Sequence, residues 1–386
     1  MAEEFKILII TDKFKGSLTA KEAAECIRKG LLQSSFGHGI NQKIKILPMA
    51  DGGEGTIDVI RKSKRGELIY AEVCDPLLRP IRAPYLLKGD KVFIEMAKCC
   101  GLQLLNENEY NPQKTSTYGL GQMILAAIEG TRVRDVVIGI GGSATNDGGI
   151  GMLRALGYRF YDDKGVETIF PGKVKKIDGA KVGLDLKRVQ FKVASDVNNP
   201  LLGKRGATMV YGPQKGAGEK MLEEMERGMH NYANVCEEYL GKTYSSQPGT
   251  GAAGGVGFAL KGFFGAELVP GWKVLSEFTN LEKIVKESDL IITGEGSIDE
   301  QSISGKLIDG VAEMAKKHSK RLWAYCGVNR LSVKQLVKAG IEKVFAISDI
   351  AGDIETSIKG AKKYLERISF DSATFLYDFQ SNRQTD

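Results

Sequence analysis

The stretch Ile7-Leu8-Ile9-Ile10, followed at once by Thr11-Asp12, decides the fold class. An apolar run this short, closed by polar residues, is typical of a parallel strand that is buried on both faces. Residues 17–31 then place apolar side chains at helical spacing, after hydroxyl residues that can cap a helix. A buried strand followed by an amphipathic helix is the repeating unit of a doubly wound α/β sheet.

The same rhythm returns near the C-terminus, where short apolar runs again alternate with helical patterns, the last of them a predicted helix at residues 356–367. With residues 7–10 and 43–47, the runs at 289–292, 322–325 and 343–346 predict a five-stranded parallel sheet. This flavodoxin-like domain is expected to use residues 1–65 and 285–386. Residues 66–284 are expected to form an inserted α/β domain of mixed sheet, because 67–101 is broken by proline pairs typical of antiparallel strands.

Composition excludes several classes of protein. The 386 residues are 42% hydrophobic and 26% charged, an ordinary globular balance, and the net charge of +6 is scattered rather than gathered in a stripe for nucleic acid. No apolar window reaches the length of a membrane span, and six cysteines without a C-x-x-C pair fit a reducing compartment. We therefore expect a cytoplasmic monomer or homodimer that binds neither nucleic acid nor membrane and acts on a small anion.

Several loops combine glycines with carboxylates, hydroxyls or lysines, often directly after a predicted strand. Glycine lets backbone N–H groups approach an anion, and carboxylates can hold Mg²⁺ against phosphate or take a proton from a hydroxyl. Loops that follow parallel strands gather at one edge of a sheet, where ligands bind. These loops predict phosphate chemistry, and they lie at residues 12–17, 51–56, 139–149, 195–199, 212–218, 249–257 and 293–299.

Two of the glycine loops leave other functions open. Residues 139–144 follow a predicted strand and Asp162 lies where a ribose-binding acid would be expected, so an NAD(P)-dependent hydroxy-acid dehydrogenase is the main rival. Residues 249–254 match G-x-G-x-x-G, but no strand pattern precedes them, and close helix packing is their alternative. A non-catalytic small-anion binding protein is the third possibility. The phosphate loop of common ATPases and the protein-kinase motifs do not occur.

Seven segments, in order and over nearly the whole chain, resemble the bacterial glycerate kinase type-1 family. They are DKFKGSL (12–18), MADGGEGT (49–56), GIGGSATNDGG (139–149), ASDVNNPLL (194–202), GPQKGA (212–217), GAAGGVG (251–257) and TGEGSIDEQSISGK (293–306). The resemblance implies a flavodoxin-like domain split between the chain ends, and transfer of phosphate from ATP to D-glycerate with Mg²⁺. The sequence departs from that family at Leu307-Ile308, Cys99-Cys100 and Tyr110, where Thr-Pro, Ala-Ser and Arg are usual.

These motifs give a set of candidate site residues. Asp196 follows a buried strand and is the predicted base for the glycerate hydroxyl, with a turn or helix cap as its alternative. Lys15 is the second catalytic candidate, because it could neutralise the phosphates or the glycerate carboxylate. A surface position is the alternative for Lys215. Substrate binding is predicted for Asp51, Gly52, Gly53, Glu54, Asn146 and Lys13, nucleotide or phosphate binding for Gly141, Gly142, Ser143, Thr145, Gly294, Gly296 and Lys215, and metal binding for Glu295 and Asp299. A kinase of this design is expected to line one crevice with Lys15, Asp51, Ser143, Asp196 and Glu295.

Overall fold

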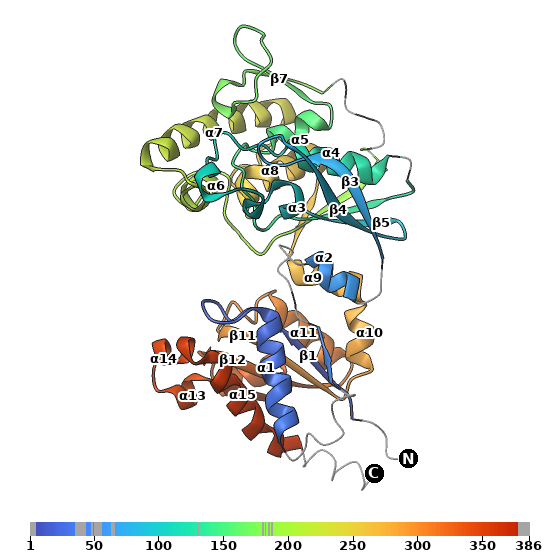
Figure 1. Cartoon of the computed structure of the whole chain (residues 1–386), viewed down its shortest axis with the longest axis vertical. Helices are drawn as coiled ribbons and strands as arrows, with labels where there is room; N and C mark the ends of the chain where they lie inside the picture. Colours follow the sequence, from blue (N-terminus) through green and yellow to red (C-terminus); the bar gives the residue numbers. More distant parts are fainter. Residues whose placement is uncertain are drawn as a thin grey trace. The chain divides into compact units, whose positions relative to one another are not determined.

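The computed structural model describes residues 5–34, 44–47, 49, 56–62, 66–129, 131–179, 181, 183, 186 and 188–376. The chain forms two compact units (Figure 1): unit 1 contains Met1–Ala50 and Leu275–Asp386, and unit 2 contains Asp51–Val274. The predicted domain limits at 65 and 285 stay a prediction, because compactness alone does not show where an independently folding domain ends.

Unit 1 is built on a five-stranded parallel sheet that both ends of the chain supply. Its strand order is β13-β12-β11-β1-β2, the flavodoxin-like order of a doubly wound sheet, so the predicted fold class is confirmed. The elements are β1 (Ile7–Thr11), α1 (Ala20–Gln33), β2 (Ile44–Ile46), α10 (Leu281–Lys286), β11 (Leu290–Ile298), α11 (Leu307–Lys317), β12 (Arg321–Asn329), α12 (Val333–Ala339), β13 (Lys343–Ala346), α13 (Ser348–Ala351), α14 (Ile354–Lys359), α15 (Ala361–Ser372) and the 3-10 turn Ala373–Leu376.

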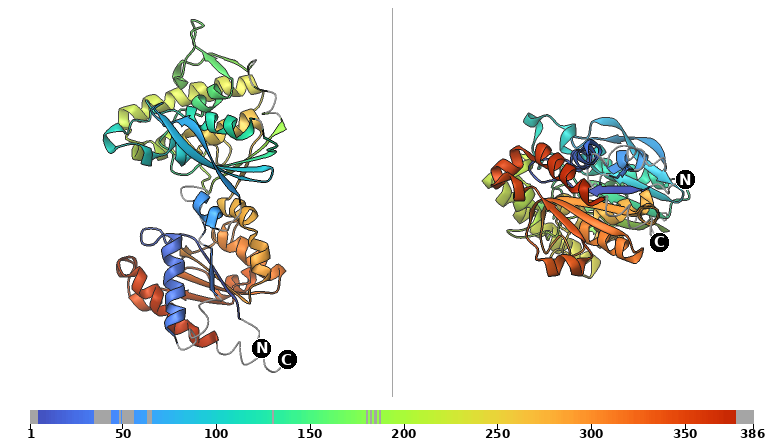
Figure 2. Two further views of the ribbon diagram at one scale, coloured as in Figure 1. Left: turned by 45° about the vertical axis from the view of Figure 1, so that its right-hand side comes forward. Right: turned by 90° about the horizontal axis from the view of Figure 1, so that it is seen from below.

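Helices cover both faces of this sheet, as the fully buried strand β1 requires. α1 and α15 pack against each other over the face that carries Ile9, Ile292 and Trp323 (Figure 2). α11 packs against β11 and β12 with its own buried side chains. α1 begins at a capping box in which the Thr19 hydroxyl accepts from Glu22 N and the Glu22 carboxylate accepts from Thr19 N.

Unit 2 holds a mixed sheet, as the sequence predicts, and the structure gives this sheet six strands. Its order is β10-β9-β6-β5-β4-β3; β5, β6, β9 and β10 are parallel, and β3 and β4 are antiparallel. The strands are β3 (Glu67–Cys74), β4 (Pro80–Lys88), β5 (Lys91–Glu95), β6 (Asp135–Gly139), β9 (Gln190–Ala194) and β10 (Glu267–Val269), and the hairpin β7 (Arg159–Tyr161) with β8 (Lys176–Asp178) lies outside the sheet. The helices are α2 (Thr56–Lys62), α3 (Ala97–Cys100), α4 (Tyr118–Ile128), α5 (Ile150–Ala155), α6 (Ala207–Tyr211), α7 (Glu219–Leu240) and α8 (Ala252–Phe264), with short 3-10 turns at Leu102–Leu104, Glu107–Glu109, Pro171–Lys173 and Pro213–Lys215; α9 (Gly271–Thr279) crosses the limit between the units.

Two predicted elements of unit 1 are corrected. Residues 356–367, predicted as one helix, belong to α14 and α15, which are separated by Gly360. Residues 293–299, predicted as a glycine-rich turn, continue strand β11 as far as Ile298, because β12 runs alongside and pairs with this segment. The glycines there lie in a strand rather than in a turn.

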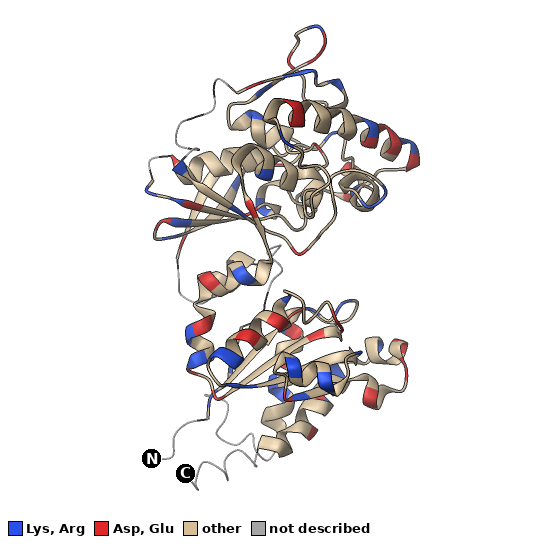
Figure 3. Ribbon diagram, turned by 180° about the vertical axis from the view of Figure 1, so that it is seen from behind, with Lys and Arg blue, Asp and Glu red and all other residues tan. Residues whose placement is uncertain are grey.

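Charges of both signs are distributed over the helices of each unit (Figure 3). Among the helices that the structure describes, none is both long enough and apolar enough to cross a membrane. Because charges of both signs are mixed on these helices, a ligand site is expected at the loops of the sheet edges rather than on a charged helix face.

Candidate functional site

Three carboxylates of unit 1 lie near one another where β1 and β11 end. The carboxylate of Glu295 interacts electrostatically with those of Asp12 and Asp299, which repel it, and with the ammonium group of Lys306, which attracts it. Asp12 N donates to the Gly294 carbonyl at 2.8 Å, which fixes the loop after β1 to β11. The edge of this sheet thus combines negative side chains with a lysine.

Gly296 explains how the loop after β1 comes so close to β11. A Cβ atom at this position would lie 2.9 Å from Lys15 N, so a larger residue would displace the loop. A Cβ atom on Gly294 would likewise lie 2.5 Å from the Tyr325 carbonyl oxygen. The exposed side chains of Lys13 and Lys15 are thereby carried on a loop that lies against the carboxylate edge.

Glu295 has the electrostatics of a cation ligand. The pKa of Glu295 is raised to about 6, chiefly by burial and in smaller part by the carboxylates of Asp12 and Asp299, while the hydrogen bond from Ser302 and the charge of Lys306 oppose the rise. Its Oε1 is buried and accepts no hydrogen bond from any described residue. No group of three or more His, Cys, Asp or Glu side chains among the described residues could hold a metal ion. Metal binding by Glu295 and Asp299 therefore stays a prediction, and an ion there would have to take its other ligands from elsewhere, as Mg²⁺ does when one or two carboxylates hold it.

Residues 140–149 of unit 2, called the glycine loop below, follow β6 in the middle of the parallel strands. Leu102 N donates to the Gly142 carbonyl at 3.0 Å, and Ala144 N donates to the Cys100 carbonyl at 2.8 Å. Gly142 has φ +72° and is exposed, and Gly141 is half-buried. The first part of the glycine loop therefore presents backbone at the surface while its second part is fixed inside.

Lys215 is buried rather than on the surface, so the alternative proposed for it is wrong. Its side chain is 1% exposed, and its Nζ donates to Ser143 Oγ at 3.0 Å and to the Thr145 carbonyl at 2.7 Å. Burial lowers the pKa of Lys215 to about 7, and the Asp147 carboxylate opposes this change. The ammonium group thus holds the inner side of the glycine loop.

Asp147 anchors the end of the same loop. Its carboxylate accepts from Thr117 N at 2.9 Å, Thr117 Oγ1 at 2.8 Å, Gly149 N at 2.9 Å and Gly151 N at 3.1 Å. Burial raises the pKa of Asp147, and these hydrogen bonds oppose the rise. Asn146, 3% exposed, donates through Nδ2 to Thr208 Oγ1 at 3.1 Å.

Asp196 is exposed and lies two residues beyond the end of β9, at the edge where the glycine loop begins. Its Oδ1 accepts from Gly271 N at 3.0 Å, the first residue of α9. This contact is the kind of helix-terminal hydrogen bond named as the alternative for Asp196, and its role as a base stays a prediction.

Sequence reasoning missed Glu95, which ends β5 at the same edge. Its side chain is fully buried, and its Oε2 accepts from Ile57 N near the start of α2 at 3.2 Å. The signal was available, because a glutamate interrupts the apolar run at residues 92–97. The predicted substrate ligands Asp51, Gly52, Gly53 and Glu54 precede α2 and lie outside the described residues.

The dehydrogenase alternative loses its structural basis. Asp162 accepts from Lys164 N and Val166 N in a turn after β7, and β7 pairs with β8 rather than with a strand of the main sheet. A ribose-binding acid would instead end a strand of that sheet. The other glycine motif serves close packing, since a Cβ on Gly254 would lie 2.1 Å from the Thr145 carbonyl.

The predicted residues therefore fall into two groups, one in each unit. Lys13, Lys15, Gly294, Gly296, Glu295 and Asp299 belong to unit 1, whereas Gly141, Gly142, Ser143, Thr145, Asn146, Lys215 and Asp196 belong to unit 2. Their convergence on one crevice stays a prediction.

Comparisons with known proteins identify the family. Residues 7–376 match the model of the glycerate kinase family. The chain is 40% identical over 369 residues to a glycerate kinase of Halalkalibacterium halodurans, covering 94% of this chain and 95% of the relative. It is 39% identical over 377 residues to the glycerate 2-kinase of Escherichia coli, covering 96% and 98%. A crystal structure of a chain assigned as glycerate kinase 2 of Salmonella typhimurium matches with a TM-score of 0.76 and 35% identity, covering 98% of this chain and 100% of that one. The resemblance read from the motifs is confirmed: the chain belongs to the glycerate kinase family and is an enzyme.

Proposed function

We propose that this enzyme transfers the terminal phosphate of ATP to a hydroxyl of D-glycerate, giving phosphoglycerate and ADP, with Mg²⁺. The observation that carries the proposal is the match of nearly the whole chain to relatives named glycerate kinase. One of them is named a 2-kinase, which favours the hydroxyl on carbon 2 as the acceptor.

The carboxylate edge of unit 1 supports the phosphate part of this reaction. Mg²⁺ held by Glu295 and Asp299 would neutralise charge on the phosphates. The buried Glu295 carboxylate gains a counter-charge for its unpartnered oxygen in this way. Lys15 and Lys13, exposed on the adjoining loop, add positive charge for phosphate or for the glycerate carboxylate.

The groups of unit 2 support orientation and proton transfer. Backbone N–H groups of Gly141 and Gly142 suit an anion, because glycine leaves them accessible. Lys215 fixes the loop from inside by its bonds to Ser143 and Thr145. Asp196, exposed at the sheet edge, accepts the proton of the attacking hydroxyl while Oδ1 remains hydrogen-bonded to Gly271 N.

The test is an assay of ATP, Mg²⁺ and D-glycerate, with the product identified by phosphorus NMR. Asp196→Asn keeps an oxygen for the Gly271 hydrogen bond and removes the charge, so turnover should fall by about 10²-fold or more with little change in stability. Asp163→Asn, an exposed carboxylate in another loop of unit 2, is the matched control and should retain wild-type turnover. Near-normal turnover of Asp196→Asn would remove the base role, and no phosphoglycerate from the wild type would refute the function.

A further inference from the structure

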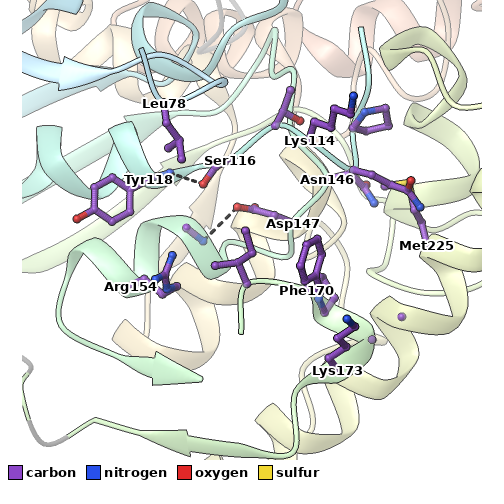
Figure 4. A pocket seen from close by; sticks show the side chains of 18 of the residues that line it. Leu78, Lys114, Ser116, Tyr118, Asn146, Asp147, Arg154, Phe170, Lys173 and Met225 are labelled. Carbon is purple, nitrogen blue, oxygen red and sulfur yellow. Dashed lines mark hydrogen bonds between the residues drawn. The ribbon is translucent and has the colours of Figure 1, made fainter. Parts of the chain in front are cut away.

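Unit 2 contains a pocket of about 790 Å³ that the proposed function leaves unused, although Asn146, a predicted substrate ligand, lines it (Figure 4). This volume lies within the roughly 300–1,000 Å³ of small-molecule sites. Its walls come from the turn after β3, the segment before α4, the end of the glycine loop, α5, the residues before β8 and the first half of α7. Elements distant in sequence therefore enclose one space.

The floor of the pocket is polar and has an acceptor without a donor. Asn146 lines the pocket at 3% exposure, and its Oδ1 is buried without a hydrogen bond from any described residue. A buried acceptor without a donor is energetically unfavourable, and a ligand N–H or O–H would supply the missing hydrogen bond. Asp147 beside it is held by hydrogen bonds from the protein, so its carboxylate is a fixed part of the floor.

The pocket is lined by three cationic side chains and by the exposed carboxylate of Glu224. Figure 4 shows Lys114, Arg154 and Lys173 around the opening, with Asp147 between them. Arg154 donates through Nε and Nη2 to Glu167, whereas Lys114 and Lys173 are exposed lysines able to reach a ligand. Such a rim suits phosphate groups.

One wall of the pocket is formed by apolar side chains that are more exposed than most apolar side chains in a folded protein. Ile169 and Phe170 are 45% and 50% exposed, and Met225 also lines the pocket. The ammonium of Lys173 lies 5.3 Å from the centre of the Phe170 ring, so a flat ligand against that ring would have a cation close by. Exposed aromatic surface in a concave site is typical of a platform for a planar ring.

From these features we infer that the pocket binds a nucleoside phosphate, with the base against Phe170, an N–H or ribose hydroxyl donating to Asn146 Oδ1 and the phosphates at Lys114 and Lys173. The inference rests on the proposed use of ATP, and the nucleotide comes from one of two sources. It is either the phosphate donor itself or a second adenine nucleotide that binds apart from the reaction.

The experiment is calorimetric titration of the full chain with ADP. Phe170→Ser should weaken ADP binding by about tenfold through loss of stacking. The double variant Lys114→Ala/Lys173→Ala should weaken it by a similar factor and reduce its salt dependence. Val166→Ser and Lys175→Ala are exposed changes in the same region outside the lining, and both should bind ADP as the wild type does. Wild-type affinity in both the Phe170 and the lysine variants would overturn the inference.

Kinetics then separate the two sources and the two proposals. If the pocket holds the phosphate donor, Phe170→Ser should raise KM for ATP by the same factor as Kd for ADP and leave KM for glycerate unchanged. If the pocket holds a second nucleotide, Phe170→Ser should leave both KM values unchanged. A wild-type protein that binds ADP through Phe170 but makes no phosphoglycerate would refute the function and leave the pocket standing. If the enzyme makes phosphoglycerate but all these variants bind ADP with wild-type affinity, the proposed function stands and the inference about the pocket is refuted.

Discussion

Replacing Lys215 by Met should change how the stability of unit 2 depends on pH. Methionine has a similar length and no charge, so the substitution removes a buried ammonium and its two hydrogen bonds to Ser143 and Thr145. Burial lowers the pKa of Lys215 from 10.5 to about 7. That shift corresponds to a cost of about 5 kcal/mol for keeping the charged form inside the protein.

The sign follows from proton counts. Below pH 7 the lysine is charged in both states, and the folded protein bears the full cost. Between pH 7 and 10.5 the unfolded chain holds a proton that the folded chain has released, so wild-type stability rises with pH by about 1.4 kcal/mol per unit relative to Lys215→Met. The lost hydrogen bonds of Ser143 and Thr145 shift the variant by a constant of about 1–3 kcal/mol each, and they leave this slope unchanged.

The assay is guanidinium unfolding at pH 6, 7.5 and 9. The chain has two tryptophans, and Trp272 is the one within unit 2, so a Trp323→Phe background lets fluorescence follow that unit. The difference between wild type and Lys215→Met should move by about 2 kcal/mol from pH 7.5 to 9. Lys220→Met, an exposed lysine at the start of α7, corrects for removal of one lysine. A difference that stays flat over this range would refute the reasoning.

Two further substitutions test the two units separately. In the absence of Mg²⁺, Glu295→Gln should raise the unfolding free energy of unit 1 by up to about 2 kcal/mol above pH 6 and by little below pH 4.5. The reason is that burial raises the pKa of Glu295 from 4.5 to about 6, so the charged carboxylate is the form that destabilises the folded state. Unfolding followed by Trp323 fluorescence at pH 4.5 and pH 8 measures the effect, and equal effects at both pH values would contradict the prediction. Gly254→Ala should destabilise unit 2 by about 3 kcal/mol or more, since φ is +66° and the new Cβ would lie 2.1 Å from the Thr145 carbonyl; an unchanged melting curve would contradict it.

The sheet of unit 1 was predictable because each of its strands is marked by a short stretch of its own sequence. Runs such as residues 7–10 and 343–346 are apolar, short and bounded by polar residues, and each became a strand. The extension of β11 through Gly294, Glu295 and Gly296 was not predictable in this way. Its backbone hydrogen bonds are completed by β12, about 30 residues later, and the glycines are explained by the loop at Lys15.

The site was less predictable than the fold for a related reason. The sequence marks Lys215 as a lysine between glycines, a pattern usual for an exposed turn, but its partners lie 70 and 72 residues away in the glycine loop. The sequence also does not indicate that Asn146 Oδ1 lacks a hydrogen-bond donor, because this depends on Thr208 lying beside the Nδ2 atom. Burial and partner geometry arise from tertiary contacts that no short motif contains.

The split of unit 1 between the two chain ends has a consequence for protein synthesis. A ribosome completes β1 about 280 residues before β11, its central partner, so the nascent strand has only the short β2 beside it. At roughly 5–20 residues per second this wait lasts from about 14 to 56 seconds. The carboxylate edge is therefore assembled only after unit 2 has been synthesised. Translation that stops before β11 releases the apolar ILIIT segment with its main partner missing, a form that chaperones and proteases would be expected to remove.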